Sequence, residues 1–221
     1  MSDYTGAVTA GGPADARDLP ALTLTKVAVG PFGNNAYLLH CKTTGAQVLI
    51  DAAHEPDTLL ALIGDRLDAV ITTHQHGDHW QALAQVVAAT GARTYAGTYD
   101  AAEIPGITDV LVADGDTIHV GDIELTAIHL AGHTPGSIAL LYTDPADPTG
   151  HPHLITGDCL FPGGIGNTWK DPERFDSLYH DVTTKIFDRL PDTTWIYPGH
   201  GGDSTLGNER PHLAEWRQRG W

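Results

Sequence analysis

The spacing of apolar residues predicts blocks of strands and helices along the chain. Period-two alternation and short apolar runs predict strands over residues 22–29, 35–41, 46–51, 69–72, 116–120, 122–130, 137–142, 153–158 and 194–197. Helical spacing predicts helices over residues 55–65, 79–90, 172–190 and 209–219. Gly91 is a plausible end for the second helix, and the segment GPFGNN is typical of a turn between strands.

The order of these elements indicates the fold class. Strands cluster first, then alternate with helices, and then the order recurs. This indicates an α+β fold in which two β-sheets pack together under covering helices. The 221 residues suffice for one domain with a substantial core, or for two small lobes. We expect a single domain over residues 21–221, after a flexible or surface-draped lead-in over residues 1–20.

Composition excludes several classes of protein. The hydrophobic share of 41% with 18% charged residues is typical of a globular chain. No window approaches the roughly 20 apolar residues of a membrane span, and no basic start precedes an apolar stretch as in a secretory signal. We therefore expect a cytoplasmic protein that does not enter membranes. No pattern in the chain indicates an oligomeric state.

The charge balance argues against a nucleic-acid partner. Twelve basic and 28 acidic residues give a net charge of −16, whereas phosphate binding requires a basic surface. Solubility is one cause of such acidity, and some carboxylates could offset bound cations. Cys41 and Cys159, the two cysteines, are expected to be reduced and buried, although Cys159 lies inside a motif described below.

The segment THQHGDHW, which follows the fourth predicted strand, concentrates candidate metal ligands. His74 and His76 are two residues apart, so their imidazoles point to the same side of an extended backbone. Gly77 permits a bend that can direct Asp78 and His79 toward a neighbouring point. The segment can thus give one pair of ligands to each of two ions, although Asp78 could instead cap the next helix. Imidazole and carboxylate suit Zn²⁺, Fe²⁺ or Mn²⁺.

Four ligands in one loop do not complete two metal sites, so distant residues are needed. Three candidates lie in glycine-rich turns after predicted strands: His133 in HLAGHTPGS, Asp158 in LITGDCLF and His200 in WIYPGHG. Such turns present side chains from several strands to one cleft.

Four motifs in order carry a family resemblance. H-x-H-x-D-H, G-H-T-P-G-S, G-D-x-L-F and Y-P-G-H-G, within residues 51–210, resemble the metallo-β-lactamase fold superfamily and, within it, the glyoxalase II-like hydrolases. The ordered set is far more specific than the first motif alone. The resemblance implies a four-layer αββα sandwich of two mixed sheets flanked by helices.

The resemblance also implies two metal sites that share one carboxylate. The implied ligands are His74, His76 and His133 for the first ion, Asp78, His79 and His200 for the second, and Asp158 for both. We expect zinc, with iron or manganese as alternatives, and catalytic roles for Asp78 and Asp158. Asp51, which ends a predicted strand, is expected either to hydrogen-bond a ligating histidine or to begin a turn.

The implied activity is hydrolysis of a thioester of a small-molecule thiol. Two divalent ions about 3.5–4 Å apart can share a water and lower its pKa from about 15.7 toward about 7, which gives a hydroxide nucleophile. A thiol leaving group, with a pKa near about 8.5, needs no strong general acid.

Rival functions stay open. A lactonase or another ester hydrolase can keep all the ligands, and a persulfide dioxygenase uses the scaffold with one iron bound by two histidines and an aspartate. β-Lactam-cleaving members generally lack the bridging aspartate, which counts against a lactamase. A non-catalytic relative would be expected to have lost ligands.

Residues beyond the metal ligands bear on the substrate. We place it near Phe161, Asn167, Trp169, Lys170 and Arg210. The alternatives are core packing for the two aromatic residues and a solvated surface charge for Lys170.

Two departures from the family pattern put glutathione in doubt as the carrier. Glutathione-using relatives have a basic residue where this chain has Asn167, with an aromatic residue two positions later, here Trp169. The chain also ends 21 residues after His200, before the helical substrate domain of the larger glyoxalase II proteins. A different small thiol, such as mycothiol, is the alternative.

Overall fold

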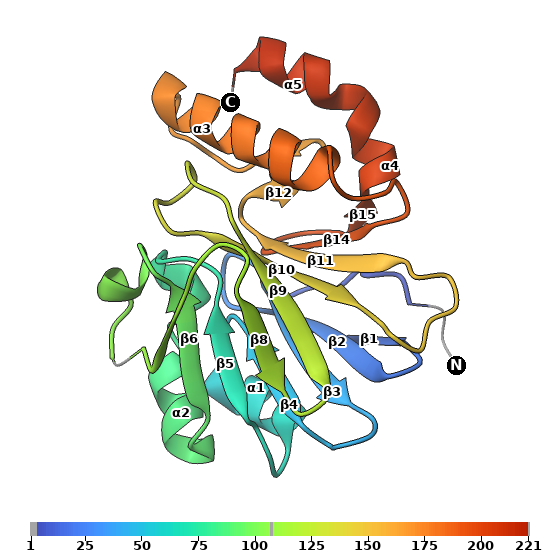
Figure 1. The fold of residues 1–221 in the computed structure, drawn as a ribbon. Coiled ribbons are helices and arrows are strands. Elements are labelled where there is room, and N and C mark those ends of the chain that lie inside the picture. The colour runs from blue at the N-terminus through green and yellow to red at the C-terminus, as the bar shows by residue number, and fades with distance from the viewer. Residues whose placement is uncertain (1–3, 107, 221) are drawn as a thin grey trace.

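Helices cover the outer faces of two packed β-sheets in the computed structural model, which describes residues 4–106 and 108–220 (Figure 1). The first sheet contains, in spatial order, β1 (Asp15–Asp18), β2 (Leu22–Val29), β3 (Asn34–Cys41), β4 (Gln47–Ile50), β5 (Ala69–Thr72), β6 (Arg93–Gly97) and β7 (Val110–Val112). The second contains, in spatial order, β15 (Ser204–Thr205), β14 (Trp195–Pro198), β11 (Pro152–Gly157), β10 (Ile138–Thr143), β9 (Ile123–His129) and β8 (Thr117–Val120). A small hairpin joins β12 (Leu160–Phe161) to β13 (Gly164–Ile165).

Each large sheet combines parallel and antiparallel pairs. Strands β1 to β4 are antiparallel, and β4 to β7 are parallel. In the second sheet β11 and β14 are parallel, and the other pairs are antiparallel. Helices α1 (Pro56–Ile63) and α2 (Leu83–Thr90) lie on the first sheet. Helices α3 (Pro172–Asp181), α4 (Leu206–Glu209) and α5 (Leu213–Arg219) lie on the second. The predicted αββα sandwich is confirmed.

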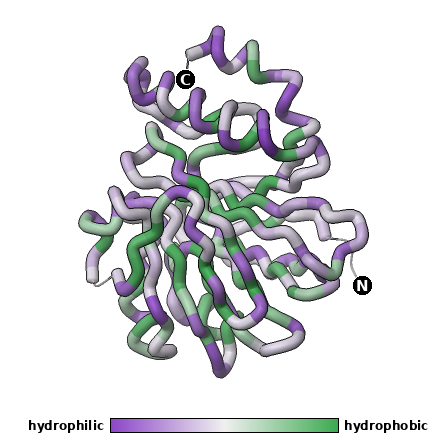
Figure 2. Tube along the Cα trace, viewed as in Figure 1, coloured by the Kyte–Doolittle hydropathy of each residue, from purple (hydrophilic) through white to green (hydrophobic). Residues whose placement is uncertain are grey.

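Alternation along the strands divides the apolar residues among three layers. In β2, Leu22 and Leu24 contribute to the cluster between the sheets, whereas Val27 and Val29 contribute to the cluster under α1 and α2. A third cluster joins the second sheet to α3 and α5, with Trp216 fully buried in it. Hydropathy follows this division, because hydrophobic positions concentrate in the strands and the outer helices alternate in character (Figure 2). Burial on both faces explains why β5, AVIT, is apolar except for Thr72.

The parallel pairs bring distant loops to one edge of the sandwich. Because β4 pairs with β5 in parallel, the loops that follow them leave the first sheet on the same side. The parallel pairing of β11 and β14 does the same for the second sheet. Polar side chains after such strand ends are therefore neighbours, which is where open sheets commonly form their sites.

The lead-in predicted to be flexible or surface-draped is attached to the first sheet over part of its length. Its residues Asp15–Asp18 form β1, which pairs with β2 from Asp15 opposite Lys26 to Asp18 opposite Thr23. The strand was not predicted because DARD has no apolar alternation, but its backbone hydrogen-bonds the edge of β2. Residues 1–3 lie outside the described residues.

Three predicted helices differ from the structure. The helix predicted over 209–219 is α-helical only over Leu213–Arg219, after a 3-10 turn at Arg210–His212. The helix predicted over 79–90 begins at Leu83, because Gln81 and Ala82 donate their backbone N–H groups to the carbonyls of Ala53 and Ala52 instead. The helix predicted over 172–190 is α-helical only to Asp181 and continues as a π-helix over Val182–Phe187. There the N–H of Asp188 donates to the carbonyl of Thr183, five residues back.

Both cysteines are free and buried. Burial raises the pKa of the Cys159 thiol, and the thiol contacts the carbonyl of Leu130 at 3.8 Å. Cys159 thus packs as a small apolar residue, not as a thiolate. Among the described residues, no helix combines the length and hydrophobicity that crossing a membrane requires.

Candidate metal centre

Seven side chains from four loops meet at the shared edge of the two sheets. They form overlapping groups of potential metal ligands, which are His74, His76 and His133, then His74, His79 and Asp158, then Asp78, His79 and His200. The donor atoms within each group lie within 4.8 Å of one another. The structure thus brings together every residue that the resemblance implies as a ligand.

The first group consists of three histidines from two loops. His74 and His76 follow β5, and His133 lies between β9 and β10. The ring centroids of His74 and His76 are 4.8 Å apart, and that of His133 lies 4.9 and 4.6 Å from them. His74 and His133 are buried, so the group opens toward solvent only past His76.

The second group combines an aspartate with two histidines. Gly77–His79 form one turn of 3-10 helix, which carries Asp78 and His79 to the side of His200. The Asp78 Oδ2 atom lies 3.5 Å from His200 Nε2 and 3.7 Å from His79 Nε2. Asp78 does not cap α2, whose cap residue Ala82 makes no side-chain cap bond.

Asp158 lies between the two groups. Its Oδ2 is 3.5 Å from His200 Nε2 and 3.8 Å from His133 Nε2, and its Oδ1 is 3.5 Å from His79 Nε2. Close packing around it requires glycine at 199, because a Cβ there would collide with the Asp158 carboxylate and lie 2.8 Å from His79 Cε1. One carboxylate therefore faces histidines from both groups.

Buried atoms that lack hydrogen-bond partners test whether these residues fit metal ions. His74 Nε2, His79 Nε2, His133 Nε2 and Asp158 Oδ1 are buried, and no partner is recorded for them among the described residues. Such atoms in native structures nearly always have a partner. Imidazole and carboxylate are ligands of Zn²⁺, Fe²⁺ and Mn²⁺, so the donor set fits two divalent ions.

The opposite ring nitrogens are held by groups outside the cluster. His79 Nδ1 lies 2.9 Å from Asp51 Oδ2, and His133 Nδ1 donates to the backbone carbonyl of Asn167 at 2.9 Å. His200 Nδ1 likewise donates to the carbonyl of Phe32 at 3.3 Å. These bonds favour the tautomer with the proton on Nδ1, which leaves the lone pair of Nε2 available to bind a metal.

Asp51 is itself fixed in a left-handed backbone conformation with φ 58°. The backbone N–H of Thr73 donates to its Oδ1 and the Thr73 hydroxyl to its Oδ2, each at 2.8 Å. A residue held at an unfavourable φ by such bonds is typical of a functional site. Asp51 therefore links the end of β4 to the ligand loop after β5.

The pKa values of the histidines are lowered in the first group, whereas those of His79 and His200 in the second group are raised. Burial lowers the pKa of His133 to about 4 and holds that of His74 well below its usual value. Burial also opposes protonation of His79 and His200, but Asp51 and Asp158 around His79, and Asp158 and Asp78 around His200, outweigh it. They raise the pKa of His79 to about 10 and of His200 to about 9.

Asp100 organises both loops of the first group, and no motif identifies it in the sequence. It is fully buried after β6, and its carboxylate accepts the backbone N–H of Gln75 at 3.0 Å and that of Gly136 at 2.6 Å. The Thr134 hydroxyl donates to it at 2.5 Å. One carboxylate thus ties the loop of His74 and His76 to the loop of His133.

We expect Asp100→Ala to lower the free energy of unfolding by about 3 kcal/mol, because the buried N–H of Gly136 and the buried hydroxyl of Thr134 lose their acceptor at about 1–3 kcal/mol each. Asp147→Ala is the matched control, since Asp147 accepts the N–H and hydroxyl of Thr149 in exposed bonds that water can replace. Urea denaturation of both variants measures the difference. Equal losses would contradict a special role for Asp100.

Asn34 is a second residue that the sequence analysis missed, although it lies in the predicted GPFGNN turn. Its Nδ2 donates to Asp78 Oδ2 at 2.8 Å and lies 3.4 Å from His200 Nε2. Its backbone also bridges that of His200. The first residue of β3 therefore contributes directly to the second group.

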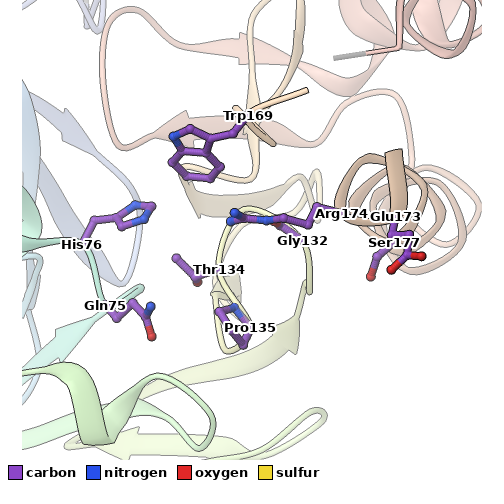
Figure 3. Close-up of a pocket in the computed structure, with 9 residues that line it drawn as sticks. All are labelled: Gln75, His76, Gly132, Thr134, Pro135, Trp169, Glu173, Arg174 and Ser177. Atoms are coloured by element: carbon purple, nitrogen blue, oxygen red, sulfur yellow. The ribbon is translucent and has the colours of Figure 1, made fainter. Parts of the chain in front are cut away.

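A cavity of about 610 Å³ opens beside His76. Its lining residues are Gln75, His76, Gly132, Thr134, Pro135, Trp169, Glu173, Arg174 and Ser177 (Figure 3). Trp169 stacks on His133 with a centroid distance of 5.4 Å, and Arg174 reaches from α3 to lie 4.2 Å from the Trp169 ring. Arg174 was not predicted, because its position in an amphipathic helix carries no motif.

Of the residues predicted to lie near the substrate, only some line the cavity. Trp169 lines the cavity, is 50% exposed and, like Lys170, has a positive φ, of 55° and 59° respectively. Asn167 contributes its backbone carbonyl to His133, and its side chain accepts the N–H of Trp169. Phe161 and Lys170 are not among the residues that line the cavity.

Arg210 requires a correction, because the structure places it in a structural role. Its Nε donates to Asp192 Oδ1 at 2.5 Å, and its other nitrogens donate to the carbonyls of Phe187 and Leu190. These bonds join the end of the π-helix to α4. The guanidinium is therefore engaged away from the cavity.

Comparison with known proteins places this site in a family. A hydroxyacylglutathione hydrolase from Polaromonas sp. is 36% identical over 172 residues, which are 76% of this chain and 62% of that relative. ETHE1 from Myxococcus xanthus has 27% identity and a TM-score of 0.76, with coverage of 88% of this chain and 84% of ETHE1. TTHA1623, solved in a di-iron-bound form, has 31% identity and a TM-score of 0.68, with coverage of 84% and 96%. Because residues 29–200 also match the family as a whole, the chain belongs to the metallo-β-lactamase superfamily.

Proposed function

We propose that this chain is a dinuclear metal-dependent hydrolase that cleaves a thioester of a small-molecule thiol. The observation that carries the proposal is the position of Asp158, whose carboxylate lies within 3.8 Å of histidines from both ligand groups. The similarity to a hydroxyacylglutathione hydrolase supports the same reaction class.

The chain's own residues would divide the work. His74, His76 and His133 would hold one ion, Asp78, His79 and His200 the other, and Asp158 would contact both. Bound divalent ions supply Lewis acidity, which polarises a carbonyl and lowers the pKa of water toward about 7. Asp51 and the carbonyls of Asn167 and Phe32 keep the histidines aligned. Asn34 holds Asp78 in place.

Among the residues that the structure describes, the site offers no free aspartic acid that could protonate a poor leaving group. Asp51, Asp78 and Asp100 each accept hydrogen bonds from neighbouring side chains, and Asp158 faces three histidines. None of these four aspartates is therefore free to act as a general acid. A thiolate, whose conjugate acid has a pKa near about 8.5, leaves without such help, unlike an amine. This favours a thioester over an amide.

The cavity beside His76 would bind the carrier thiol. The Arg174 guanidinium donates to the backbone carbonyls of Gly132 and His133 and stacks on Trp169, so two of its five N–H donors and one face are engaged within the protein. Glu173 adds negative charge to the lining. A carrier with two free carboxylates, such as glutathione, fits this lining poorly. A sugar-containing carrier such as mycothiol can stack on Trp169 and hydrogen-bond Gln75 and Ser177.

A second candidate is a mononuclear-iron persulfide dioxygenase, which the similarity to ETHE1 supports. The complete second group argues against it, because Asp78, His79 and His200 offer three donors within 4.8 Å of one another. Metal analysis separates the two candidates. About two ions per chain favours the hydrolase, and one iron with oxygen uptake on a persulfide favours the dioxygenase.

A substrate panel tests the proposal. The protein is loaded with Zn²⁺, Fe²⁺ or Mn²⁺ and offered S-lactoyl and S-formyl thioesters of glutathione and mycothiol, a lactone and a β-lactam. We expect thioester cleavage, faster on the sugar-containing carrier. Lactone cleavage without any thioester cleavage would replace the proposal with a lactonase, and equal rates on both carriers would remove the carrier assignment alone.

We expect Trp169→Ala to raise KM for the best thioester about tenfold while kcat changes little, because loss of an aromatic contact costs about 1.4 kcal/mol. Tyr99→Ala is the matched control, since Tyr99 is also exposed and contacts His129, which is not a ligand. Steady-state kinetics measure both. An unchanged KM in Trp169→Ala would place the carrier outside the cavity.

A further inference from the structure

The N-terminal segment reaches the turn that carries His200, although almost the whole chain separates them. The Tyr4 hydroxyl donates to Asp203 Oδ2 at 2.5 Å, and the carbonyl of Gly6 accepts from Lys26 Nζ at 2.8 Å. A Cβ at Gly6, whose φ is +68°, would collide with the Asp203 carboxylate. Residues 4–6 therefore pack directly on Asp203, three positions after His200.

Lys26 connects this segment to the turn itself. It lies in β2 with no exposed surface, and its Nζ donates to Asp203 Oδ1 at 2.6 Å and to the carbonyl of Gly201 at 2.7 Å. Burial lowers the pKa of its ammonium group, which Asp203 opposes. A buried ammonium needs such acceptors, so a loss of any of them disturbs the others. We call Tyr4, Gly6, Lys26 and Asp203 the N-terminal latch.

The other side of the same turn is held by β3. Asn35 Nδ2 donates to the carbonyls of Pro198 and Gly201 at 2.8 and 3.0 Å, and the Tyr37 hydroxyl donates to Pro198 at 2.6 Å. The carbonyl of Gly201 thus accepts from both Lys26 and Asn35. The residue next to His200 is fixed from two directions, and one of them depends on the N-terminal segment.

We infer that the N-terminal latch positions His200 and thereby sets the affinity of the second metal ion without affecting the first. The ligands of the first ion are fixed by Asp100 and by the carbonyl of Asn167. Within residues 4–106 and 108–220, no hydrogen bond joins a latch residue to either of them. Tyr4 and Lys26 are positioning residues, because they act through the backbone at Gly201. The inference rests on the two-ion site proposed above but not on any particular substrate.

The first test removes one hydroxyl from the latch. In Tyr4→Phe, we expect the dissociation constant of the second ion to rise about tenfold, as when a group that orients a ligand is lost, and that of the first ion to stay within about twofold. The matched control is Tyr179→Phe, whose hydroxyl donates to the carbonyl of Leu213 between α3 and α5. Stepwise Zn²⁺ titration against a chromophoric chelator measures both constants.

The second test displaces the segment while the buried charges are kept. Gly6→Ala forces a side chain against Asp203, and Gly11→Ala is its control, because Gly11 has a similar φ of +75° with nothing within 4 Å of its Cβ position. We expect Gly6→Ala, but not Gly11→Ala, to weaken the second ion about tenfold. Folding of all variants is verified by circular dichroism.

Hydrogen exchange in the metal-free protein tests the latch independently of metal binding. The N–H of Gly199 donates to the carbonyl of Gly157 at 2.8 Å, so its hydrogen exchange reports on the His200 turn. We expect exchange about tenfold faster in Tyr4→Phe and Gly6→Ala than in their controls. Unchanged exchange and second-ion affinity in folded variants overturns the latch, as does equal weakening of both ions. If only one ion binds but hydrogen exchange is accelerated as expected, the two-ion site is contradicted while the positioning role of the latch is supported.

Discussion

Asp158→Ala is expected to reduce turnover at least about a hundredfold and to leave fewer than two ions bound per chain. Replacement of a group that only orients a ligand costs about 10–100-fold, and Asp158 faces both ligand groups directly. Its carboxylate also offsets the charge of His79 and His200, so its loss leaves the second group the weaker of the two. Elemental analysis after gel filtration measures the metal, and thioester hydrolysis measures turnover.

The control for this prediction is another buried carboxylate remote from the site. Asp144 is buried and accepts the backbone N–H groups of Ala21 and Ala146, each at 2.8 Å. Asp144→Ala should lower stability while the metal content stays unchanged. If Asp158→Ala keeps two ions and its activity, the carboxylate between the groups has no role in either.

The second ion is expected to bind more tightly as pH rises from 6 to 9, by up to about a hundredfold per unit, while the first changes little. In the metal-free protein, the pKa is about 10 for His79 and about 9 for His200, so both are positively charged imidazolium groups at pH 7. A metal must displace both protons, and each displaced proton contributes about tenfold per unit below the pKa of its histidine. The first group is already neutral, because the pKa of His133 is about 4 and those of His74 and His76 are lowered.

Calorimetry in buffers of different ionisation enthalpy counts these protons. Near pH 7 we expect about two protons released with the second ion and close to none with the first. The same number for both ions would show that the carboxylates do not hold the histidines of the second group in the charged form. His79→Gln, which removes one titrating group, should reduce the release with the second ion by about one.

Much of the fold and all of the candidate ligands could be predicted because their signals are local. The bounds of β2 and β5 match the predictions, since each is a bounded apolar or alternating run. The candidate ligands could be named because metal coordination demands particular residue types in particular turns, as in GHT at His133 and PGHG at His200.

The groups that support the ligands could not be predicted, because their partners are distant in sequence. Asp100 receives its bonds from residues 25 and 34–36 positions away, and Tyr4 donates to a residue 199 positions away. Neither lies in a motif. Arg210 shows the opposite error, because a basic residue near a motif was assigned to substrate although Asp192 and two carbonyls bind it.

Because the candidate ligands come from both sheets, the two ligand groups become complete at different times while the chain is being translated. Both ligand groups combine residues after β5 with residues from the second sheet, so neither is complete while the first sheet stands alone. The three histidines of the first group have all been translated once His133 is made, whereas the second group must wait for His200. A nascent chain therefore cannot complete both ligand groups before the turn after β14 emerges from the ribosome.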